Sequence, residues 1–470
     1  MSIIIPANSA VAGGYDVDNS VRFNNSEYLQ RTNGTATDDK KYSLSFWVKR
    51  SKLGEDDRIF NNQYDGSNWG YLMFKSDNTI RIADRQAGTD RIDWITTQVF
   101  RDISAWYHFY LAIDTTQGTA DNRVKFYVNG TQVTSFTKNV SPSLNNALGF
   151  QQATATNLAR IATADGGGNL FSGYMSEIVF IDGTQNAVTD FGEFDEDSGI
   201  FKPIDVSGLT FGDNGYYLNF QDSAELGTDV SGESNTYTEV NLTAVDQSTD
   251  TCTNNFATLN ILDTFYTSST ISDGNLTLVG GGTNANMNAT IGLASGKWYW
   301  ETKVSDWQGT NNSAIGISSE SPTATNYEFY NKSGNNTGYG YYSNGSVYGN
   351  GGTPATGYGS AAGTHYISVA LDLDNNKIAW GYDGTFQGSA NPATGANMIA
   401  ITAPSSLATG LYFPAFTNKS GTKTLNVNFG SPPYSESGGE TDGNGYGNFA
   451  YAVPSGYFAL NTKNLSEVLS

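Results

Sequence analysis

The chain has 470 residues, of which 38% are hydrophobic and 13% aromatic, so it can form two or three domains with cores of their own. Its 46 acidic and 25 basic residues give a net charge of −21, and no cluster of Lys and Arg interrupts this excess, which argues against nucleic-acid binding. The single cysteine, Cys252, excludes an intrachain disulfide and a Cys-based metal cluster, and no apolar stretch approaches the roughly 20 residues that membrane insertion requires.

Residues 1–20 are predicted to form an N-terminal arm that is too short and polar to fold alone. A first set of strands follows over 21–185, beginning with "VRFNNSEYLQ" and ending with "SGYMSEIVFIDG". Its clearest member is "YSLSFWVKR", in which Leu44, Phe46 and Val48 alternate with polar residues. Alternation with a period of two is typical of strands, so the set predicts a β-sandwich.

Residues 186–260 form an acidic segment of mixed character, which we expect to be an irregular linker that packs partly on the first sandwich. The stretch "EFDED" within it resembles the carboxylate strand of glucanases only in composition, because it lacks the interleaved apolar residues of a buried strand. We therefore expect a solvated acidic loop, with cation binding as a lesser alternative.

Residues 261–435 contain a second set of strands, from "LDTFY" to "TLNVNFG", and residues 436–470 form a C-terminal tail. Asn-Gly and Asp-Gly pairs punctuate both sets at short intervals, as in tight hairpins. The predicted fold class is all-β, with two tandem antiparallel β-sandwiches of the jelly-roll type.

One pattern occurs twice, around the only two histidines, His108 and His365. Each histidine opens an alternating apolar run that is followed by an aspartate, a polar turn and a second alternating run. The second run ends at Asn129 or Asp383, and a glycine comes next. Each repeat is predicted to be a central hairpin, and both histidines to be satisfied strand residues, so the chain repeats an architecture and not an active site.

The first set resembles a concanavalin A-like lectin/glucanase domain of the laminin-G type. The pieces that carry the resemblance are "VRFNNSEYL", "YSLSFWVKR", "WYHFYLAID", "VKFYVNG" and "FSGYMSEIVFIDG", in the order of the family. The second set resembles a SPRY domain, through "SGKWYWETKV", "AIGISS", "GYGYYSNGSVYGNGG", "HYISVALDLDNNKIAWGYDG" and "YFPAFTNKSGTKTLNVNFG". The resemblances imply scaffold roles for Trp47, Trp106, His108, Trp298, Trp300 and Trp380.

The pairing of these domains and the joint between them resemble structural proteins of tailed-phage virions. The resemblance implies localisation in the virion, other virion proteins as partners and a homo-oligomeric assembly there. It also implies a non-enzymatic component of a tail fibre, a spike or the capsid surface that attaches to a host-surface glycan or protein. A purely architectural role is the alternative, and a polysaccharide depolymerase is the less favoured one.

The best sequence candidate for a binding surface is the tyrosine-rich stretch 326–352, whose Gly, Asn and Ser background is typical of adaptable binding loops. It yields the ligand-binding candidates Tyr339, Tyr341, Tyr342 and Tyr348. Alternation places Tyr339 and Tyr341 on one face, so some of these rings are also expected in the core.

No catalytic, cofactor-binding or metal site is predicted, and the chain is expected not to be an enzyme. A Ser-His-Asp triad would need one of the two strand histidines, and no nucleophile elbow is present. The stretches at 16–20, 190–197 and 372–376 could each supply oxygen ligands to calcium, but Asp374 and Asn375 are explained by the chemistry of a hairpin turn. Cys252 lies in a polar segment and is expected to be inert.

Overall fold

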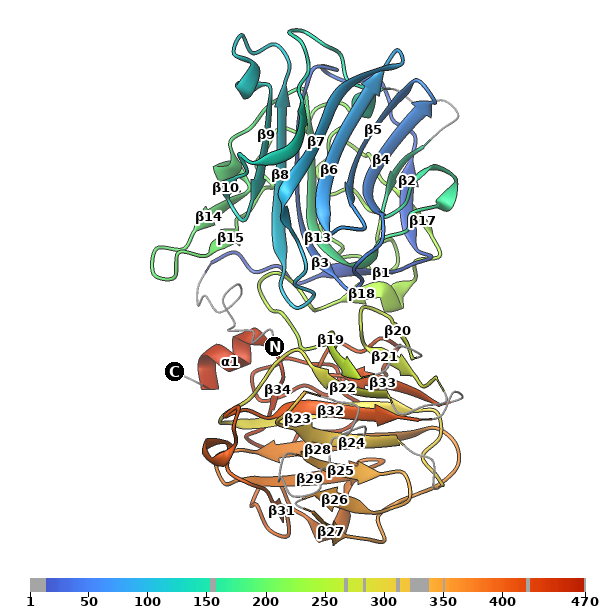
Figure 1. Cartoon of the computed structure of the whole chain (residues 1–470), viewed down its shortest axis with the longest axis vertical. Coiled ribbons are helices and arrows are strands. Elements are labelled where there is room, and N and C mark those ends of the chain that lie inside the picture. The colour runs from blue at the N-terminus through green and yellow to red at the C-terminus, as the bar shows by residue number, and fades with distance from the viewer. Residues whose placement is uncertain are drawn as a thin grey trace. The chain divides into compact units, whose positions relative to one another are not determined.

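The structure is a computed structural model, and it describes residues 14–152, 158–265, 269–281, 285–309, 313–321, 338–349, 351–419 and 423–468. Residues 14–254 belong to one compact unit and residues 255–468 to another. We call them the first and the second unit and describe each by itself (Figure 1).

The first unit consists of antiparallel strands in two large sheets (Figure 1). In spatial order, one sheet contains β10 (Thr131–Gln132), β9 (Val124–Val128), β8 (Tyr107–Asp114), β3 (Lys41–Arg50), β13 (Ser172–Asp182), β1 (Ser20–Asn24) and β18 (Gln247–Ser248), with β16 (Tyr216–Leu218) also paired to β13. The other contains β11 (Phe136–Val140), β7 (Thr89–Val99), β6 (Thr79–Gln86), β5 (Asn68–Phe74), β4 (Asp57–Asp65), β12 (Ala159–Ile161), β2 (Tyr28–Arg31) and β17 (Thr238–Val240).

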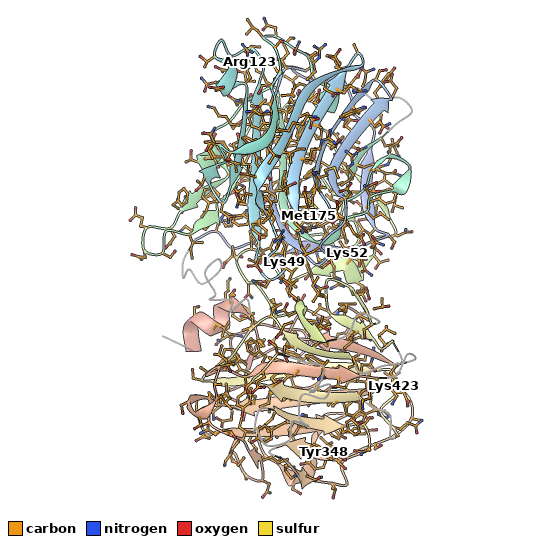
Figure 2. The ribbon with its side chains drawn as sticks, viewed as in Figure 1. Lys49, Lys52, Arg123, Met175, Tyr348 and Lys423 are labelled. Carbon is orange, nitrogen blue, oxygen red and sulfur yellow. The ribbon has the colours of Figure 1, made fainter. Side chains whose placement is uncertain are left out.

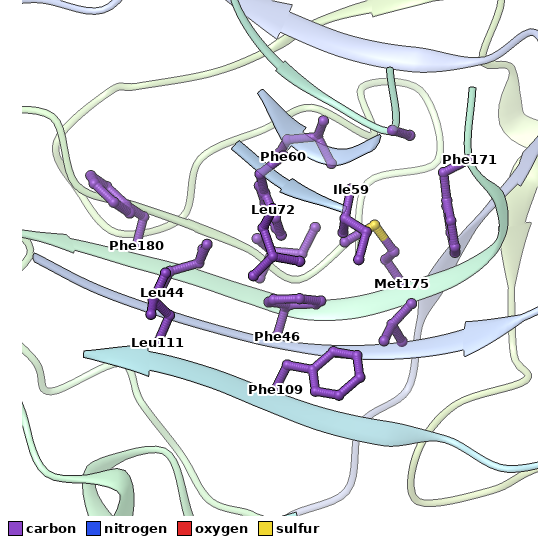
Figure 3. Close-up of a cluster of buried hydrophobic side chains, with 14 of the residues drawn as sticks. Leu44, Phe46, Ile59, Phe60, Leu72, Phe109, Leu111, Phe171, Met175 and Phe180 are labelled. Atoms are coloured by element: carbon purple, nitrogen blue, oxygen red, sulfur yellow. The ribbon is translucent and has the colours of Figure 1, made fainter. Parts of the chain in front are cut away.

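The core of the first unit lies between these sheets, as Figure 3 shows. Phe46 of β3 meets Phe60 of β4 edge to face, with ring centroids 4.8 Å apart, so the two sheets interdigitate. Each such buried ring contributes about 1.5–3 kcal/mol through the loss of water contact. The labelled members of this cluster are Leu44, Phe46, Ile59, Phe60, Leu72, Phe109, Leu111, Phe171, Met175 and Phe180.

The stretch "VRFNNSEYLQ", with which the first strand set begins, contributes to two strands. It forms β1 and β2, which lie in opposite sheets. Between them Asn25 has a φ of 62°, and the Glu27 carboxylate accepts a hydrogen bond from the backbone N–H of Asn24 at 2.6 Å. A positive φ is tolerated by Asn more readily than by most residues, so this turn moves the chain from one sheet to the other.

The acidic segment after β13 covers the outward face of the sheet that contains β8 and β13. Phe191, Phe211 and Tyr217 pack against Tyr110 of β8 and Val179 of β13. The segment also supplies β14 (Gly192–Phe194), β15 (Phe201–Pro203), β16, β17 and β18. The polar face of "YSLSFWVKR" is therefore buried as well as the apolar one.

A buried ion pair fixes the end of this segment. Lys49 Nζ lies 2.7 Å from Asp250 Oδ2, and both side chains are at most 2% exposed. The other oxygen of Asp250 accepts a hydrogen bond from Trp106 Nε1 at 3.0 Å. Removing one partner of such a pair leaves an uncompensated buried charge, which typically costs about 3–5 kcal/mol.

The second unit is also a sandwich of antiparallel strands. One sheet contains β19 (Leu259–Phe265), β22 (Ala285–Ala289), β32 (Phe413–Asn418), β24 (Ser313–Ser318), β25 (Gly338–Tyr342), β26 (Val347–Gly349) and β27 (Gly352–Ala355). The other contains β20 (Thr270–Ser272), β21 (Thr277–Val279), β33 (Thr424–Asn428), β23 (Lys297–Val304), β28 (His365–Asp372), β29 (Lys377–Tyr382) and β30 (Thr385–Phe386), with β31 (Ile399–Ala400) on β29 and β34 (Phe458–Ala459) parallel to β23.

The segment after β33 packs onto the second unit through one carboxylate. Glu301 of β23 accepts hydrogen bonds from the backbone N–H groups of Ala450 at 2.8 Å and Tyr451 at 3.1 Å, and from the Tyr299 hydroxyl at 2.7 Å. Burial raises the pKa of Glu301 to about 7. The chain then forms β34 and α1 (Thr462–Val468), and among the described residues no helix has the length and apolar character of a membrane span.

The repeated sequence pattern forms one structural device in both units. The β8–β9 hairpin ends at Asn129 (φ 46°) and Gly130 (φ 74°), and the β28–β29 hairpin at Asp383 (φ 45°) and Gly384 (φ 78°). The Asn129 side chain accepts a hydrogen bond from the backbone N–H of His108 at 2.8 Å, as the Asp383 side chain does from that of Tyr366 at 2.9 Å. This confirms the prediction that the repeat is architectural.

Candidate functional site

The four tyrosines that the sequence singled out lie in strands β25 and β26, not in an open loop. Tyr339 and Tyr341 are 1% and 0% exposed and point into the core of the second unit, so their rings offer no surface to a ligand. Tyr342 is 8% exposed and packs edge to face on Tyr348, with ring centroids 5.6 Å apart. Tyr348, labelled in Figure 2, is half-buried, and residues 326–337 and 350 of the same stretch lie outside the described residues.

The two histidines occupy strands, as predicted. His108 is fully buried, its Nε2 lies 2.8 Å from Ser45 Oγ, and its Nδ1 has no hydrogen-bond partner among the described residues. Burial lowers the pKa of His108 to about 3, so the ring is neutral. His365 Nδ1 lies 2.7 Å from Asp383 Oδ2 and its ring stacks on Tyr382, an arrangement that closes the hairpin.

The predicted scaffold residues Trp47, Trp106, Trp298, Trp300 and Trp380 are all buried. Cys252 is buried too, and burial raises the pKa of its thiol well above the ordinary value. A buried thiol of this kind is a poor nucleophile, in agreement with the expectation that Cys252 is inert.

Two of the three candidate cation sites, 190–197 and 372–376, contain turns, while 16–20 is extended chain that leads into β1. Asp374 Oδ1 accepts a hydrogen bond from the backbone N–H of Gly296 at 2.7 Å, and Asn375 donates to Asp372. Asp195 of "EFDED" accepts hydrogen bonds within its own turn and lies 3.4 Å from Lys202 Nζ. Within the described ranges, no group of three or more His, Cys, Asp or Glu side chains could hold a metal ion.

A polar cleft of about 500 Å³ opens in the first unit. One wall is the segment 35–40, and the other is the turn 148–152 that contains the short 3₁₀ helix η2 (Gly149–Gln151). Gln86, at the end of β6, completes the lining. We call this site the polar cleft and define it by Thr35, Ala36, Thr37, Asp38, Asp39, Lys40, Gln86, Leu148, Gln151 and Gln152.

A buried carboxylate at the end of β13 joins the two walls of the polar cleft. Asp182 Oδ1 accepts a hydrogen bond from Gln151 Nε2 at 2.8 Å, and Oδ2 accepts one from the backbone N–H of Thr37 at 2.7 Å. Oδ2 also accepts a hydrogen bond from the backbone N–H of Asn214 at 3.1 Å, so the same carboxylate also contacts the acidic segment 186–260. Because one side chain holds both walls, the polar cleft is positioned by strand β13.

A second buried carboxylate fixes the turn itself. Asp84 of β6 accepts the backbone N–H groups of Gly149 at 2.9 Å and Phe150 at 2.8 Å. Asn62 Nδ2 donates to the carbonyl oxygens of Phe150 at 2.5 Å and Gln152 at 3.2 Å. Burial raises the pKa of Asp84 to about 7 in spite of its two N–H partners.

The turn lies so close to the sheet that only glycine fits there. A Cβ at Gly149 would lie 2.3 Å from the backbone oxygen of Arg85, and one at Gly70 would lie 2.6 Å from Cβ of Phe150. These distances are far below ordinary van der Waals contact, so both glycines are needed for the close approach. The turn is therefore rigidly attached to β5 and β6.

The polar cleft is rich in hydrogen-bond acceptors. The side-chain oxygens of Gln151 and Gln152 are buried and have no partner among the described residues, and Gln151 is only 2% exposed. Asp38 and Asp39 add carboxylates that pair loosely with neighbouring lysines, at 3.5 Å to Lys41 and 3.2 Å to Lys40. Such a lining favours a ligand that presents hydroxyl or N–H donors.

Gln151 also lines a second, smaller pocket, together with Arg31 and Asn62. Arg31 Nε, Asn62 Oδ1 and Gln151 Oε1 are buried around it without partners among the described residues. The cavity leaves about 20 Å³ for the centres of water-sized molecules, which is room for a bound water and not for a larger ligand. The open polar cleft is therefore the part of this region that can receive a ligand.

The sequence interpretation missed this site. Asp182 was visible only as half of a turn signal before Gly183, and Asp84 as a polar residue in a strand. The one local signal was the pair of acidic and basic residues at 38–41 opposite the Gln-Gln pair at 151–152, and nothing in the sequence brings those stretches together.

Comparisons with known proteins match the two strand sets to two families. Residues 23–187 match the concanavalin A-like lectin/glucanases superfamily, and residues 297–432 match the SPRY domain. A comparison with curated proteins finds no match.

Several solved structures resemble parts of the chain. The SPRY domain of human HERC1 is 15% identical over 36% of this chain and 96% of its own, with a TM-score of 0.27. A heptameric SAP-like pentraxin from Limulus polyphemus is 16% identical, and the match covers 36% of this chain and 77% of the pentraxin, with a TM-score of 0.26. Domain 4 of AbnA, a GH43 extracellular arabinanase from Geobacillus stearothermophilus solved with arabinotriose, is 17% identical over 38% and 82%, with a TM-score of 0.28.

Each family match lies within one of the two sandwiches, and the polar cleft lies entirely within the first match. The chain therefore contains a concanavalin A-like domain followed by a SPRY domain.

Proposed function

We propose that this chain is a non-catalytic binding module whose first unit binds a neutral saccharide in the polar cleft. The observation that carries the proposal is the acceptor-rich lining of the polar cleft, held in place by Asp182 and Asp84. Its volume of about 500 Å³ lies in the usual range of small-molecule sites.

The chemistry of the lining supports a saccharide over other small ligands. Sugar hydroxyls are donors, and they satisfy carboxylate oxygens such as those of Asp38 and Asp39. Lys40 is the only basic residue that lines the polar cleft, and its Nζ lies 3.2 Å from the Asp39 carboxylate. Anionic sugars are thus disfavoured at this site.

A glycan array probed with the full chain tests the proposal. We expect binding to at least one neutral saccharide, and we expect Gln86→Ala to weaken it about tenfold, because that side chain lines the polar cleft. Gln98→Ala, at an exposed position of β7, is the matched control and should bind as the wild type does. Binding that is equally strong in both variants, or cleavage of the bound saccharide, would contradict the proposal.

The setting proposed for this module is the virion of a tailed phage, as the sequence resemblance implies, with attachment to a host-surface glycan as its role. The tandem sandwiches and the net charge of −21, which opposes self-association, support a displayed surface protein. Weak single sites would gain avidity from many copies. Mass spectrometry and cryo-electron microscopy of purified virions should detect the chain on the particle surface, and its absence from particles would refute this setting.

A purely architectural role is the second candidate, and the packing of the buried Tyr342 on the half-buried Tyr348 is the observation that favours it. These rings pack beside Ala314 and Ala415 on a separate apolar cluster of the second unit. In that case the second unit would contact other virion proteins. Particle maps in which both units are enclosed by neighbouring proteins would support the architectural role over host attachment.

A further inference from the structure

In the first unit, a group of basic and aromatic side chains lies on the outward face of the sheet that contains β4 to β7. Strands β4, β5, β6 and β7 are neighbours there (Figure 1). Leu72 and Ile82 belong to the core, so alternation directs the residues beside them to the opposite face. We call this surface the arginine face and define it by Arg58, Trp69, Tyr71, Arg81 and Arg85.

The guanidinium groups of the arginine face stack on its two rings. Trp69 and Tyr71 are stacked on each other, with centroids 5.1 Å apart and an interplanar angle of 20°. Cζ of Arg85 lies 5.3 Å from the Trp69 centroid, while Cζ of Arg58 and of Arg81 lie 3.2 Å and 5.7 Å from the Tyr71 centroid. The stacking holds three planar donor groups along one line of the sheet.

Two of the arginines have carboxylate partners. Arg81 binds Asp93 in a bidentate manner, with Nε and Nη2 each 2.9 Å from a carboxylate oxygen, and Lys138 of β11 pairs with the same carboxylate. Arg85 Nε lies 2.7 Å from Asp90. Three cationic side chains on this surface therefore share two carboxylates.

Arg58 differs from them. Its Nε and Nη1 are buried and have no hydrogen-bond partner among the described residues. Burial lowers the pKa of its guanidinium, and this effect outweighs the interaction with the Tyr71 side chain, which raises that pKa. The nearby charge of Arg81 lowers the pKa further, and that of Asp56 raises it. Arg58 has thus lost water without gaining an anion, in a chain whose net charge is −21.

We propose that the arginine face binds the oxyanion of an acidic saccharide, through Arg58 and Arg81. A carboxylate, sulfate or phosphate group at this position would face the guanidinium groups of Arg58 and Arg81, and a planar guanidinium favours charge-assisted, bidentate contacts with such anions. Trp69 provides apolar surface beside this position for the carbon face of a sugar ring. This site is separate from the polar cleft and selects the opposite ligand chemistry.

Titration calorimetry with the full chain and short probes tests this proposal. The probes are digalacturonate, a galactose disaccharide with one sulfate, one with one phosphate, and neutral galactobiose. We expect at least one acidic probe to bind at least tenfold more tightly than galactobiose, with an affinity that falls as salt increases. The acidic probe that binds most tightly identifies the oxyanion.

Variants assign the binding to the arginine face. We expect Arg58→Gln to lower the affinity for the acidic probe about tenfold. Lys52→Gln, at an exposed lysine outside this face that Figure 2 labels, should leave binding unchanged. If Arg58→Gln fails to fold, Lys138→Gln replaces it, because that side chain is 47% exposed and its loss should weaken the probe about threefold.

The result that would overturn the proposal is equal binding of acidic and neutral probes, or equal affinities in Arg58→Gln and Lys52→Gln. Gln86→Ala, which alters the polar cleft, should leave the acidic probe unaffected. A loss of acidic binding in Gln86→Ala alone would place the acidic ligand in the polar cleft and refute the arginine face.

Discussion

Asp182 Oδ1 accepts a hydrogen bond of 2.8 Å from Gln151 Nε2, across a sequence separation of 31 residues. The same carboxylate holds Thr37, so it joins the two walls of the polar cleft. Asp182→Ala would remove the acceptor of the Thr37 and Asn214 backbone N–H groups and one of the two acceptors of Gln151 Nε2. Each donor that is left buried without a partner costs about 1–3 kcal/mol. We expect denaturant unfolding to show a marked loss of stability.

Asp182→Asn is the milder variant of the same test. The amide keeps one acceptor oxygen and can serve either Gln151 or Thr37, but not both. We expect a smaller loss of stability than in Asp182→Ala, together with weaker saccharide binding, because the walls of the polar cleft are no longer joined. Unchanged binding in a folded Asp182→Asn protein would show that the walls are positioned by other contacts.

The close approach of the turn at Gly149 predicts a large effect of a single methyl group. Gly149→Ala would place Cβ 2.3 Å from the backbone oxygen of Arg85, so the turn must move away from β6. We expect a loss of about 1–3 kcal/mol, as in other overpacked sites. Gly118→Ala, where a Cβ meets nothing within 4 Å, is the control, and equal melting temperatures for the two variants would refute this explanation.

Glu301 predicts a pH dependence in the second unit. Burial raises its pKa from 4.5 to about 7 in the folded protein, so the folded state retains a proton that the unfolded state releases within this range. The Glu301 contribution to the free energy of unfolding therefore falls as the pH rises from about 4.5 to 7. Chemical denaturation should show that the free energy of unfolding falls less between pH 5 and pH 7.5 in Glu301→Gln than in the wild type.

The control for this experiment is Glu440→Gln, an exposed position in the segment that Glu301 holds. It should retain the pH dependence of the wild type. Identical slopes in the wild type and Glu301→Gln would contradict the assignment to Glu301.

The hairpin cap at Asn129 predicts different effects for two substitutions. Asn129→Ala loses the hydrogen bond to the backbone N–H of His108 and places alanine at a φ of 46°, which together should cost about 1–2 kcal/mol. Asn129→Asp keeps the acceptor, as Asp383 does in the second unit, and should be nearly neutral. Thermal unfolding compares the two variants. A larger loss of stability in Asn129→Asp than in Asn129→Ala would refute the view that Asn129 and Asp383 have the same role.

The strands were predictable because their alternation is local. The β8–β9 and β28–β29 hairpins follow from repeats of apolar residues and from Asn-Gly and Asp-Gly pairs, and both are present. The burial of both faces of β3 was not predictable, because on the second face Trp47 packs with Phe201 and Lys49 pairs with Asp250, both far along the chain. A local polar pattern cannot reveal such a cover.

The candidate site shows the same limit. Tyrosine-rich composition favoured Tyr339 and Tyr341, but these rings fill a core, since β25 lies between two other strands. Asp84 and Asp182 position the polar cleft from two sheets, and each looks in the sequence like an ordinary polar residue of a strand. Pairings between distant segments decide this site, and a single sequence does not contain them.

The most direct test of saccharide binding is a crystal structure of the full chain grown with the neutral saccharide that binds best on the array. The proposal predicts that the sugar lies in the polar cleft between residues 35–40 and 148–152, with its hydroxyls on the carboxylate oxygens of Asp38 or Asp39. A sugar bound beside Tyr348 in the second unit, or an array on which no neutral saccharide binds, would contradict it.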